Sequence, residues 1–352
     1  MKALVIRKKR KWLPFIIGFG FLVVFALAAF FSGLLGGSGS GQKSDFKVNS
    51  DVDVGKLKCP FDGAALNALP KHSPIAVIID NLPAARPQSG LKNADLVLET
   101  LAEGGVTRLL AVYYHGEASS VGPIRSARPY FIELAGSFQA VLVHAGGSPE
   151  ALKTMKSADF PHLNEFNHSG YFWRLRDRRA PHNLYSSTES IYNLAAEVGL
   201  NDQDEVTGFT FKDPKAVEVP EDDGLVSNEV KIHFPKQYDV TYSYVPEEQF
   251  YRRSIAGEPH VDALTNTQLS PRNIIVKFVK TKVIDSQGRL QMEINGHGRA
   301  LVFTGGNVIE AVWQKSAVGN SSIYKTMNGE IVELSPGQTW IEVLPETTKV
   351  TF

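Results

Sequence analysis

Residues 74–80 of the chain read PIAVIID, an apolar run that ends in a carboxylate. A continuous apolar run of this length predicts a strand that is buried on both faces of a sheet. Residues 95–100 and 106–114 predict two further strands, and the Glu-Gly-Gly sequence between them is a tight-turn signal. Residues 139–144 predict a fourth strand. This part of the chain is therefore expected to form a sheet with a buried centre.

Helical signals alternate with these strands. Ser148 followed by Pro149 is typical of a helix start, and that helix is expected to end near residue 157. Residues 186–199 carry an apolar stripe at helical spacing. Ser186 and Glu189 form a capping box at its start, and a glycine closes it. Residues 59–200 thus predict a mixed α/β domain.

The remainder of the ectodomain differs in pattern. Residues 201–229 are acidic and contain two prolines, which predicts a connector. From residue 230 onward, strand-like segments such as 240–244 and 273–279 alternate with glycine-containing turns, and no helical stripe of useful length follows residue 200. We therefore expect an α+β protein with a mixed α/β N-terminal domain and a β-rich C-terminal domain.

The N-terminus predicts a membrane anchor. Residues 12–35 are uncharged and long enough to cross a bilayer, and a basic segment precedes them. The positive-inside rule places that segment in the cytoplasm and exports the rest. A cleaved signal peptide is the alternative. The expected organisation is a basic tail (1–11), a single transmembrane helix (12–35), a flexible Gly/Ser linker (36–58), the mixed α/β domain (59–200), the acidic connector (201–229) and the β-rich domain (230–352).

Composition excludes some classes of protein. The chain has 37 basic and 37 acidic residues and no net charge, which argues against nucleic acid as a partner. Cys59 is the single cysteine, so no intramolecular disulfide forms. No cysteine closes the apolar run, so we expect no lipid attachment there. Cys59 lies in a turn-like segment, where packing or solvent exposure is expected rather than a nucleophilic role.

A receptor for an anion needs hydrogen-bond donors in fixed positions, and residues 122–130, GPIRSARPY, supply them. Ser126 is the expected N-cap of a helix whose first turn contains Pro129. Arg125 and Arg128 flank that helix start, whose free N–H groups and dipole favour a carboxylate, phosphate or sulfate. Internal ion pairing of each arginine is the alternative.

Carboxylates mark a second group of candidates. Asp80 and Asn81 end a buried strand, where ligands gather in α/β sheets. Glu99 and Glu103 flank the Gly-Gly turn and suggest glycosidase-like acid/base chemistry, with Asp80 as a further catalytic candidate. Salt bridges with Arg108 and its neighbours are the alternative.

Several polar residues complete the predicted pocket. His144 precedes a Gly-Gly-Ser sequence that resembles a simple anion cradle, although N-capping by Ser148 explains it equally well. His182 and Asn183 follow a basic, aromatic-edged loop. The ligand-binding candidates together are Asp80, Asn81, Arg86, Arg108, Arg125, Ser126, Arg128, His144, Ser148, His182 and Asn183. The spacing of His162, Glu165 and His168 matches no zinc motif, so neither a metal nor a cofactor is expected.

Several long motifs in the same order resemble the YerB-like bacterial lipoprotein family, the DUF3048 N- and C-terminal domains of unknown function. These motifs are PIAVIIDN (74–81), AARPQSGL (84–91), EGGVTR (103–108), GPIRSARP (122–129), HAGGS (144–148) and APHNLY (180–185). The resemblance implies a mixed α/β domain followed by a β-rich domain, and it supplies no reaction or catalytic residue. This chain departs from the family in lacking a lipidation cysteine at the apolar run.

Three functions remain open from the sequence. The first is a membrane-anchored extracytoplasmic protein that binds an anionic or polyhydroxylated ligand, such as a cell-wall glycan or peptide. The second is a cell-wall glycan hydrolase or lyase that uses Asp80, Glu99 or Glu103. The third is an envelope scaffold whose β-rich domain docks a membrane partner.

Overall fold

The computed structural model describes residues 57–201, 206–213, 225–234, 238–316 and 319–352. The predicted cytoplasmic tail and transmembrane helix, and most of the predicted linker, lie outside the described residues. Within the described ranges, no helix has both the length and the apolar character needed to span a bilayer. Residues 56–352 form one compact unit.

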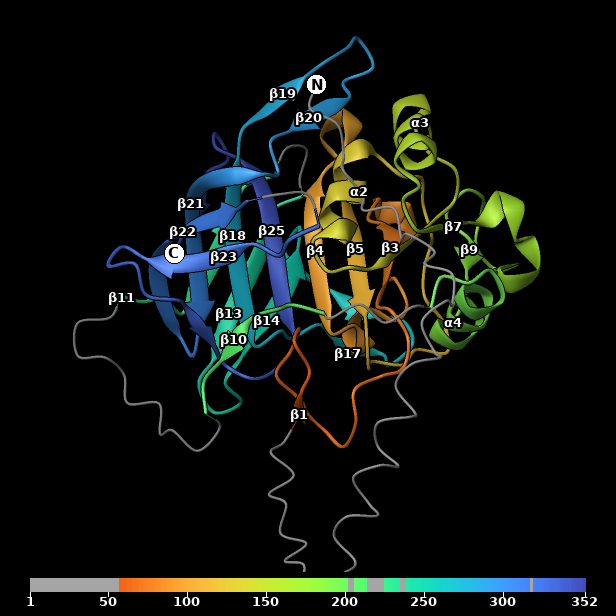
Figure 1. The fold of residues 1–352 in the computed structure, drawn as a ribbon. Coiled ribbons are helices and arrows are strands. Elements are labelled where there is room, and N and C mark those ends of the chain that lie inside the picture. The colour runs from red at the N-terminus through yellow and green to blue at the C-terminus, as the bar shows by residue number, and fades with distance from the viewer. Residues whose placement is uncertain (1–56, 202–205, 214–224, 235–237, 317–318) are drawn as a thin grey trace, which may run out of the picture. The chain divides into compact units, whose positions relative to one another are not determined.

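A large mixed sheet organises this unit (Figure 1). Its strands lie in the order β11-β22-β21-β18-β25-β4-β5-β3-β6-β7, and β23 pairs with β22. From the first edge to the last, the bounds are Leu225–Val226 (β11), Asn307–Lys315 (β22), Gly296–Thr304 (β21), Asn273–Val279 (β18), Thr339–Pro345 (β25), Leu96–Leu101 (β4), Thr107–Tyr113 (β5), Ile75–Asp80 (β3), Val141–His144 (β6) and His162–Asn164 (β7), with β23 at Ile323–Thr326.

The predicted strands form at the expected places. The apolar run is β3, and every one of its residues is buried. β3 pairs antiparallel with β5 and parallel with β6, while β4 pairs antiparallel with β5. Strand-rich structure with few helices agrees with the α+β class.

One sheet joins the two regions that the sequence presents as separate domains. β25 lies parallel to β4 on one side and parallel to β18 on the other. A strand close to the C-terminus therefore completes a sheet that begins with β3. Parts of the predicted connector also form strands, since β11 belongs to this sheet and β10 (Thr210–Phe211) pairs with β24 (Glu333–Leu334).

Both faces of the sheet are covered, which explains its uniformly apolar central strands. Helix α2 (Pro129–Gly136) lies in front of β4 and β5 in Figure 1 and contacts α3 (Pro149–Ala158). On the opposite face, a five-stranded antiparallel sheet packs through Tyr242 and Arg253, which reach Glu342 and Glu99. Its strands are β15 (Glu258–Pro259), β14 (Phe250–Ile255), β13 (Val240–Val245), β12 (Glu229–Ile232) and β26 (Val350–Thr351).

Short elements complete the chain. The two-stranded pairs are β1 (Leu57–Lys58) with β2 (Ala65–Leu66), β8 (Trp173–Arg174) with β9 (Leu184–Tyr185), β16 (Val261–Asp262) with β17 (Thr267–Gln268), and β19 (Thr281–Val283) with β20 (Leu290–Met292). Single 3₁₀ turns occupy Pro83–Ala85, Leu91–Asn93, Glu103–Gly105, Glu165–Asn167 and Ser169–Tyr171.

Two helix starts differ from the sequence expectation. Ser148 caps α3 as predicted, because its side chain accepts from the N–H of Ala151. The prediction that Ser126 caps α2 is wrong: Arg128 occupies the N-cap position and makes no side-chain cap. Helix α4 (Thr188–Glu197) is capped by Ser187 instead of Ser186, whose hydroxyl donates to the carbonyl of Tyr171.

A buried ion pair links the two sheets across the core. Glu99 on β4 and Arg253 on β14 are both fully buried, and the guanidinium donates to the carboxylate. Glu99 also accepts from the Asn81 side chain at 2.9 Å and from the hydroxyl of Thr107. Burial lowers the pKa of Arg253, but Glu99 outweighs it, so the net pKa of this arginine is raised. Arg253 is therefore charged in the folded protein.

We expect Glu99→Gln to lower the free energy of unfolding by about 3–5 kcal/mol, because it leaves the Arg253 charge buried without its counter-ion. Urea unfolding followed by circular dichroism measures the change. The double variant Glu99→Met/Arg253→Met removes both charges and should recover most of the loss. A single variant as stable as the parent would show that the pair does not hold the sheets together.

Candidate functional site

The candidate site is built where β3 and β6 end. These strands are parallel, so their carboxyl ends share one edge of the sheet. The backbone of Arg125 bridges the two ends: its N–H donates to the carbonyl of Ile78 at 2.9 Å, and its carbonyl accepts from the N–H of Ala145 at 3.0 Å. The GPIRSAR segment thus lies across this edge and places the Arg125 side chain there.

Asp80 is the centre of the site. Its carboxylate is almost fully buried, and one oxygen, Oδ2, lies 2.7 Å from Nδ1 of His182 and 3.0 Å from Nε of Arg125. The other oxygen accepts from the N–H of Leu82 at 3.0 Å. One carboxylate therefore orients two basic side chains, Arg125 and His182, that are themselves 17–20% exposed.

Arg125 differs from the other arginines nearby. Its Nε lies close to Asp80 without hydrogen-bond alignment, and its two terminal nitrogens donate to no described residue. The neighbouring arginines all donate from their terminal nitrogens to protein acceptors. Arg86 donates to the carbonyl of Asn81, and Arg178 donates to the carbonyls of Ala85 and Pro87. Arg108 donates to the carbonyl of Ser126 and to Glu103, and Arg128 donates to the carbonyl of Ala127 and to Glu103. Arg125 therefore has a guanidinium fork available for a ligand.

Arg108 and Arg128 form a separate ion-pair cluster with Glu103. Both guanidiniums contact the same carboxylate. Partial burial opposes ionisation of Glu103, but Arg128 and Arg108 prevail and lower its pKa to about 2. Glu103 is therefore ionised at neutral pH and holds no proton to donate. Of the predicted pair flanking the helix start, only Arg125 keeps a free fork.

Glu99 and Asn81 lie in the interior instead of at the open edge. Both side chains are fully buried, and Asn81 contacts Glu99, Thr107 and Gln88. Arg86 packs over the ring of Tyr238 at 4.9 Å and binds the Asn81 side chain. These residues support the floor of the site, and neither buried side chain reaches solvent.

His144 and Ser148 serve the local backbone. His144 is fully buried, donates from Nδ1 to the carbonyl of Gly146 at 2.7 Å, and accepts at Nε2 from His162 at 3.0 Å. Burial lowers the pKa of His144 to about 4, so its ring is neutral. The Ser148 side chain caps α3.

Asn183 positions the loop that carries His182. Its side chain donates to the carbonyl of Leu175 at 3.2 Å and accepts from Arg174 at 3.2 Å. Its neighbours Leu184 and Tyr185 form β9, which pairs with β8. The hairpin thereby fixes the direction from which His182 approaches Asp80.

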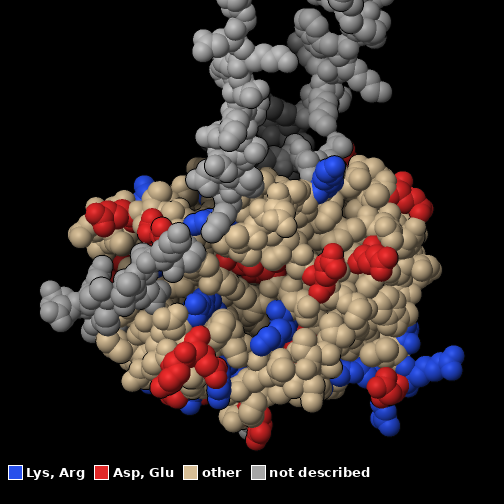
Figure 2. Space-filling view, turned by 90° about the horizontal axis from the view of Figure 1, so that it is seen from below, with Lys and Arg blue, Asp and Glu red and all other residues tan. Residues whose placement is uncertain are grey.

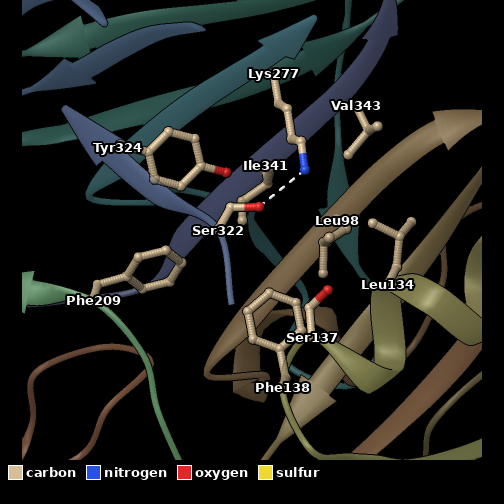
Figure 3. A pocket seen from close by; sticks show the side chains of 10 residues that line it. All are labelled: Leu98, Leu134, Ser137, Phe138, Phe209, Lys277, Ser322, Tyr324, Ile341 and Val343. Atoms are coloured by element: carbon tan, nitrogen blue, oxygen red, sulfur yellow. Dashed lines mark hydrogen bonds between the residues drawn. The ribbon is translucent and has the colours of Figure 1, made fainter. Parts of the chain in front are cut away.

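A buried lysine that sequence reasoning missed lies between α2 and the sheet (Figure 3). Lys277 on β18 points into a small cavity of about 10 Å³, roughly the space of one water molecule. Its ammonium donates to Ser322 at 2.9 Å and to the carbonyl of Ile294 at 3.2 Å. Burial, with Lys315 nearby, lowers the pKa of Lys277 to about 7. The cavity is too small for a ligand, so we assign Lys277 a structural role.

Comparison with known proteins identifies the family. Residues 63–201 match the N-terminal domain, and residues 230–341 the C-terminal domain, of the protein of unknown function DUF3048. The chain belongs to the DUF3048 family. It is 34% identical over 296 residues to the Bacillus subtilis protein named "Putative lipoprotein YerB", which covers 83% of this chain and 87% of that protein.

A solved structure supports the same assignment. The crystal structure of YerB from Bacillus subtilis matches this DUF3048 protein with a TM-score of 0.75 and 32% identity, covering 84% of this chain and 100% of the other. The resemblance predicted from the motifs is thereby confirmed. The family description names no activity, so the function has to be argued from the site.

The pKa of Glu103 predicts an acid-dependent contribution to stability. The folded-state pKa lies below the ordinary value of 4.5, so the contribution is present above pH 4.5 and is lost as pH falls toward 2. When the pH falls from about 5 to about 3, the parent should lose roughly 1–2 kcal/mol more unfolding free energy than Glu103→Gln loses, allowing for solvent screening. Urea unfolding at the two pH values measures it. The exposed Glu117→Gln is the control, and equal behaviour of both variants would contradict the prediction.

Lys277 predicts a further rise in stability at neutral to alkaline pH. Its folded-state pKa of about 7 lies below the ordinary value of 10.5, so the folded protein gains stability as pH rises through this range. When the pH rises from about 7 to about 9, the unfolding free energy of Lys277→Met should increase by roughly 1–2 kcal/mol less than that of the parent. Chemical unfolding at both pH values checks this, with the exposed Lys282→Met as control. An undiminished gain in Lys277→Met would assign the effect to other groups.

Proposed function

We propose that this protein is a membrane-anchored extracytoplasmic protein that binds an anionic group of a cell-wall glycan or peptide through Arg125 and His182. The carrying observation is the arrangement around Asp80. A single buried carboxylate oxygen orients both side chains, and the guanidinium of Arg125 keeps two terminal nitrogens without a hydrogen bond to any described residue. A guanidinium fork beside an imidazole is suited to a carboxylate or phosphate.

The β8–β9 hairpin supports a polymer as the ligand. It carries Trp173 on the strand that pairs with β9, and 37% of this side chain is exposed. An exposed indole provides an apolar face for a sugar ring, while its neighbours Arg174 and Arg176 are exposed cations. The hairpin that supplies His182 therefore also supplies a surface on which a glycan would lie.

The membrane anchor is proposed from the sequence and from the relative. The basic tail and the apolar run at residues 12–35 predict a retained helix that exports the rest of the chain. The Bacillus subtilis relative is named "Putative lipoprotein YerB", which agrees with attachment to a membrane. This chain has no cysteine at that run, so its anchor would be the helix itself.

We favour binding over hydrolysis because the three candidate carboxylates already contact basic side chains of the protein. Glu99 is buried against Arg253, and the pKa of Glu103 is lowered to about 2, so neither is placed to act as a general acid at neutral pH. Asp80 is held by Arg125, His182 and a backbone N–H. An acid/base pair facing a ligand is therefore not formed by the three predicted carboxylates.

We expect the soluble ectodomain (residues 46–352) to bind purified cell-wall fractions saturably and in a salt-sensitive manner. Arg125→Gln should weaken this binding about 10-fold or more, because it removes charged hydrogen bonds to the ligand. Co-sedimentation over a range of wall concentrations measures the affinity, and thermal unfolding confirms that the variant is folded. His182→Gln should weaken binding in the same direction.

Arg252→Gln is the matched control, since it removes an exposed arginine of β14, outside the β8–β9 hairpin. Equal binding by Arg125→Gln and the parent would refute the site. Equal loss in Arg125→Gln and Arg252→Gln would show that binding depends on diffuse positive charge instead of the Asp80 arrangement.

A further inference from the structure

A second polar cluster lies at the opposite edge of the sheet. β5 runs antiparallel to β3 and ends at Tyr113, so His115 follows it at the edge away from the Asp80 site. Asp95 precedes β4 at this same edge, since the strand begins at Leu96. The hairpin of β1 and β2, at the bottom of Figure 1, contributes Cys59 and Asp62. Four potential metal ligands therefore come from three separate segments.

We propose that Cys59, Asp62, Asp95 and His115 form a binding site for a divalent transition-metal ion, with Zn²⁺ as the best-suited ion. One ligand atom from each residue lies within 4.8 Å of all the others. The set offers one sulfur, one imidazole nitrogen and two carboxylate oxygens. Mixed sulfur, nitrogen and oxygen donors are typical of zinc, whereas Ca²⁺ and Mg²⁺ prefer oxygen alone.

The distances around His115 suit a shared metal ion. Nε2 lies 3.0 Å from Oδ2 of Asp62 and 3.0 Å from Oδ1 of Asp95. A single ring nitrogen carries at most one N–H, which cannot align with both carboxylates at once. Ligand atoms about 2.0–2.3 Å from a tetrahedral zinc ion lie roughly 3.3–3.8 Å from one another, so a small adjustment brings these atoms to coordination distance.

The backbone already orients both carboxylates toward the histidine. The second oxygen of Asp62 accepts from the N–H of Ala64 at 3.0 Å. The second oxygen of Asp95 accepts from three successive backbone N–H groups, those of Tyr114, His115 and Gly116. Hydrogen bonds of this kind hold metal ligands in position in known sites. They leave one oxygen of each aspartate directed at His115.

A tight turn brings Cys59 and Asp62 to the same side. The N–H of Cys59 donates to the carbonyl of Ala64 at 2.8 Å, and the N–H of Gly63 donates to the carbonyl of Cys59 at 2.9 Å. Gly63 has a φ of +71°, which the turn requires. Two ligands separated by two residues on such a turn match the spacing seen in structural zinc sites.

The close approach of Asp95 and His115 also depends on a glycine, Gly116. A Cβ atom at Gly116 would lie 2.1 Å from the carbonyl oxygen of Asn93 and 3.0 Å from Oδ1 of Asp95. Only glycine allows the segment after His115 to lie this close to Asp95. Figure 2 shows acidic and basic side chains scattered among neutral ones, so a broad acidic patch is not visible on the part of this face that is in view.

The chemistry favours a structural metal over a cysteine nucleophile. Cys59 is fully buried, so no substrate reaches its sulfur. Both carboxylates contact the same nitrogen of His115, whereas a nucleophile relay uses the two ring nitrogens for different partners. Four protein ligands leave no open coordination position. The metal would fasten the β1–β2 hairpin, the first element of the compact unit, to the end of the sheet.

Cobalt substitution of the ectodomain (residues 46–352) tests the proposal. We expect one Co²⁺ per chain, with the visible bands of tetrahedral cobalt and a thiolate charge-transfer band, and we expect added Zn²⁺ to displace it. Cys59→Ser should abolish the thiolate band and weaken Zn²⁺ binding at least 10-fold. His162→Gln, which alters the contact between His144 and the half-buried His162 outside the proposed metal site, is the matched control and should bind like the parent.

A second variant keeps the test decisive if Cys59→Ser does not fold. Asp62→Asn retains the oxygen that accepts from Ala64, and it should also weaken Zn²⁺ binding at least 10-fold. Addition of a chelator should lower the melting temperature of the parent and of His162→Gln, but not of Asp62→Asn. No stoichiometric Co²⁺ or Zn²⁺ binding by the parent, unchanged binding by Asp62→Asn, or loss of binding in His162→Gln would each overturn the proposal.

Discussion

The parallel pairing of β25 with β4 is the constraint on which the rest of the structure depends. It joins strands from the two ends of the compact unit into one sheet, and it places Glu342 directly beside Glu99. Two buried carboxylates side by side repel each other, and burial together with Glu99 raises the pKa of Glu342 to about 8. Arg253 from the facing sheet donates to Glu99 and to the hydroxyl of Tyr242, which in turn donates to Glu342. The arginine therefore makes the pairing possible and fixes the second sheet against the first.

Local patterns predicted the elements well where one physical signal dominated. The apolar runs at β3 and β18 specify buried strands because no other structure hides so many apolar residues in so short a segment. Neighbouring serines at 186 and 187 compete equally for the N-cap of α4, and tertiary contact decides between them. The position of β25 beside β4 was not predictable, because no local pattern specifies a partner about 240 residues away.

The candidate sites show the same division. Asp80 and Arg125 were predicted because a strand end and a helix start are recognisable, but the pairing of Arg128 with Glu103 depends on geometry that the sequence does not show. Lys277 did leave a signal, as a single charge within an apolar strand. Cys59, Asp95 and His115 carry no mutual spacing that a motif would detect, since only the antiparallel return of β5 brings them together.

The late position of β25 has a consequence for how the chain acquires its structure. While the chain is synthesised from its N-terminus, β3, β4 and β5 can form long before residues 339–345 exist, because Thr100 and its hydrogen-bond partner Val343 are 243 residues apart. During that interval β4 presents an unpaired, apolar edge, the kind of edge that recruits strands from other chains. Contacts of such high sequence separation also form slowly. Residues 339–345 thus protect the edge of β4 within the same chain, and the nascent chain is most prone to aggregation before they join the sheet.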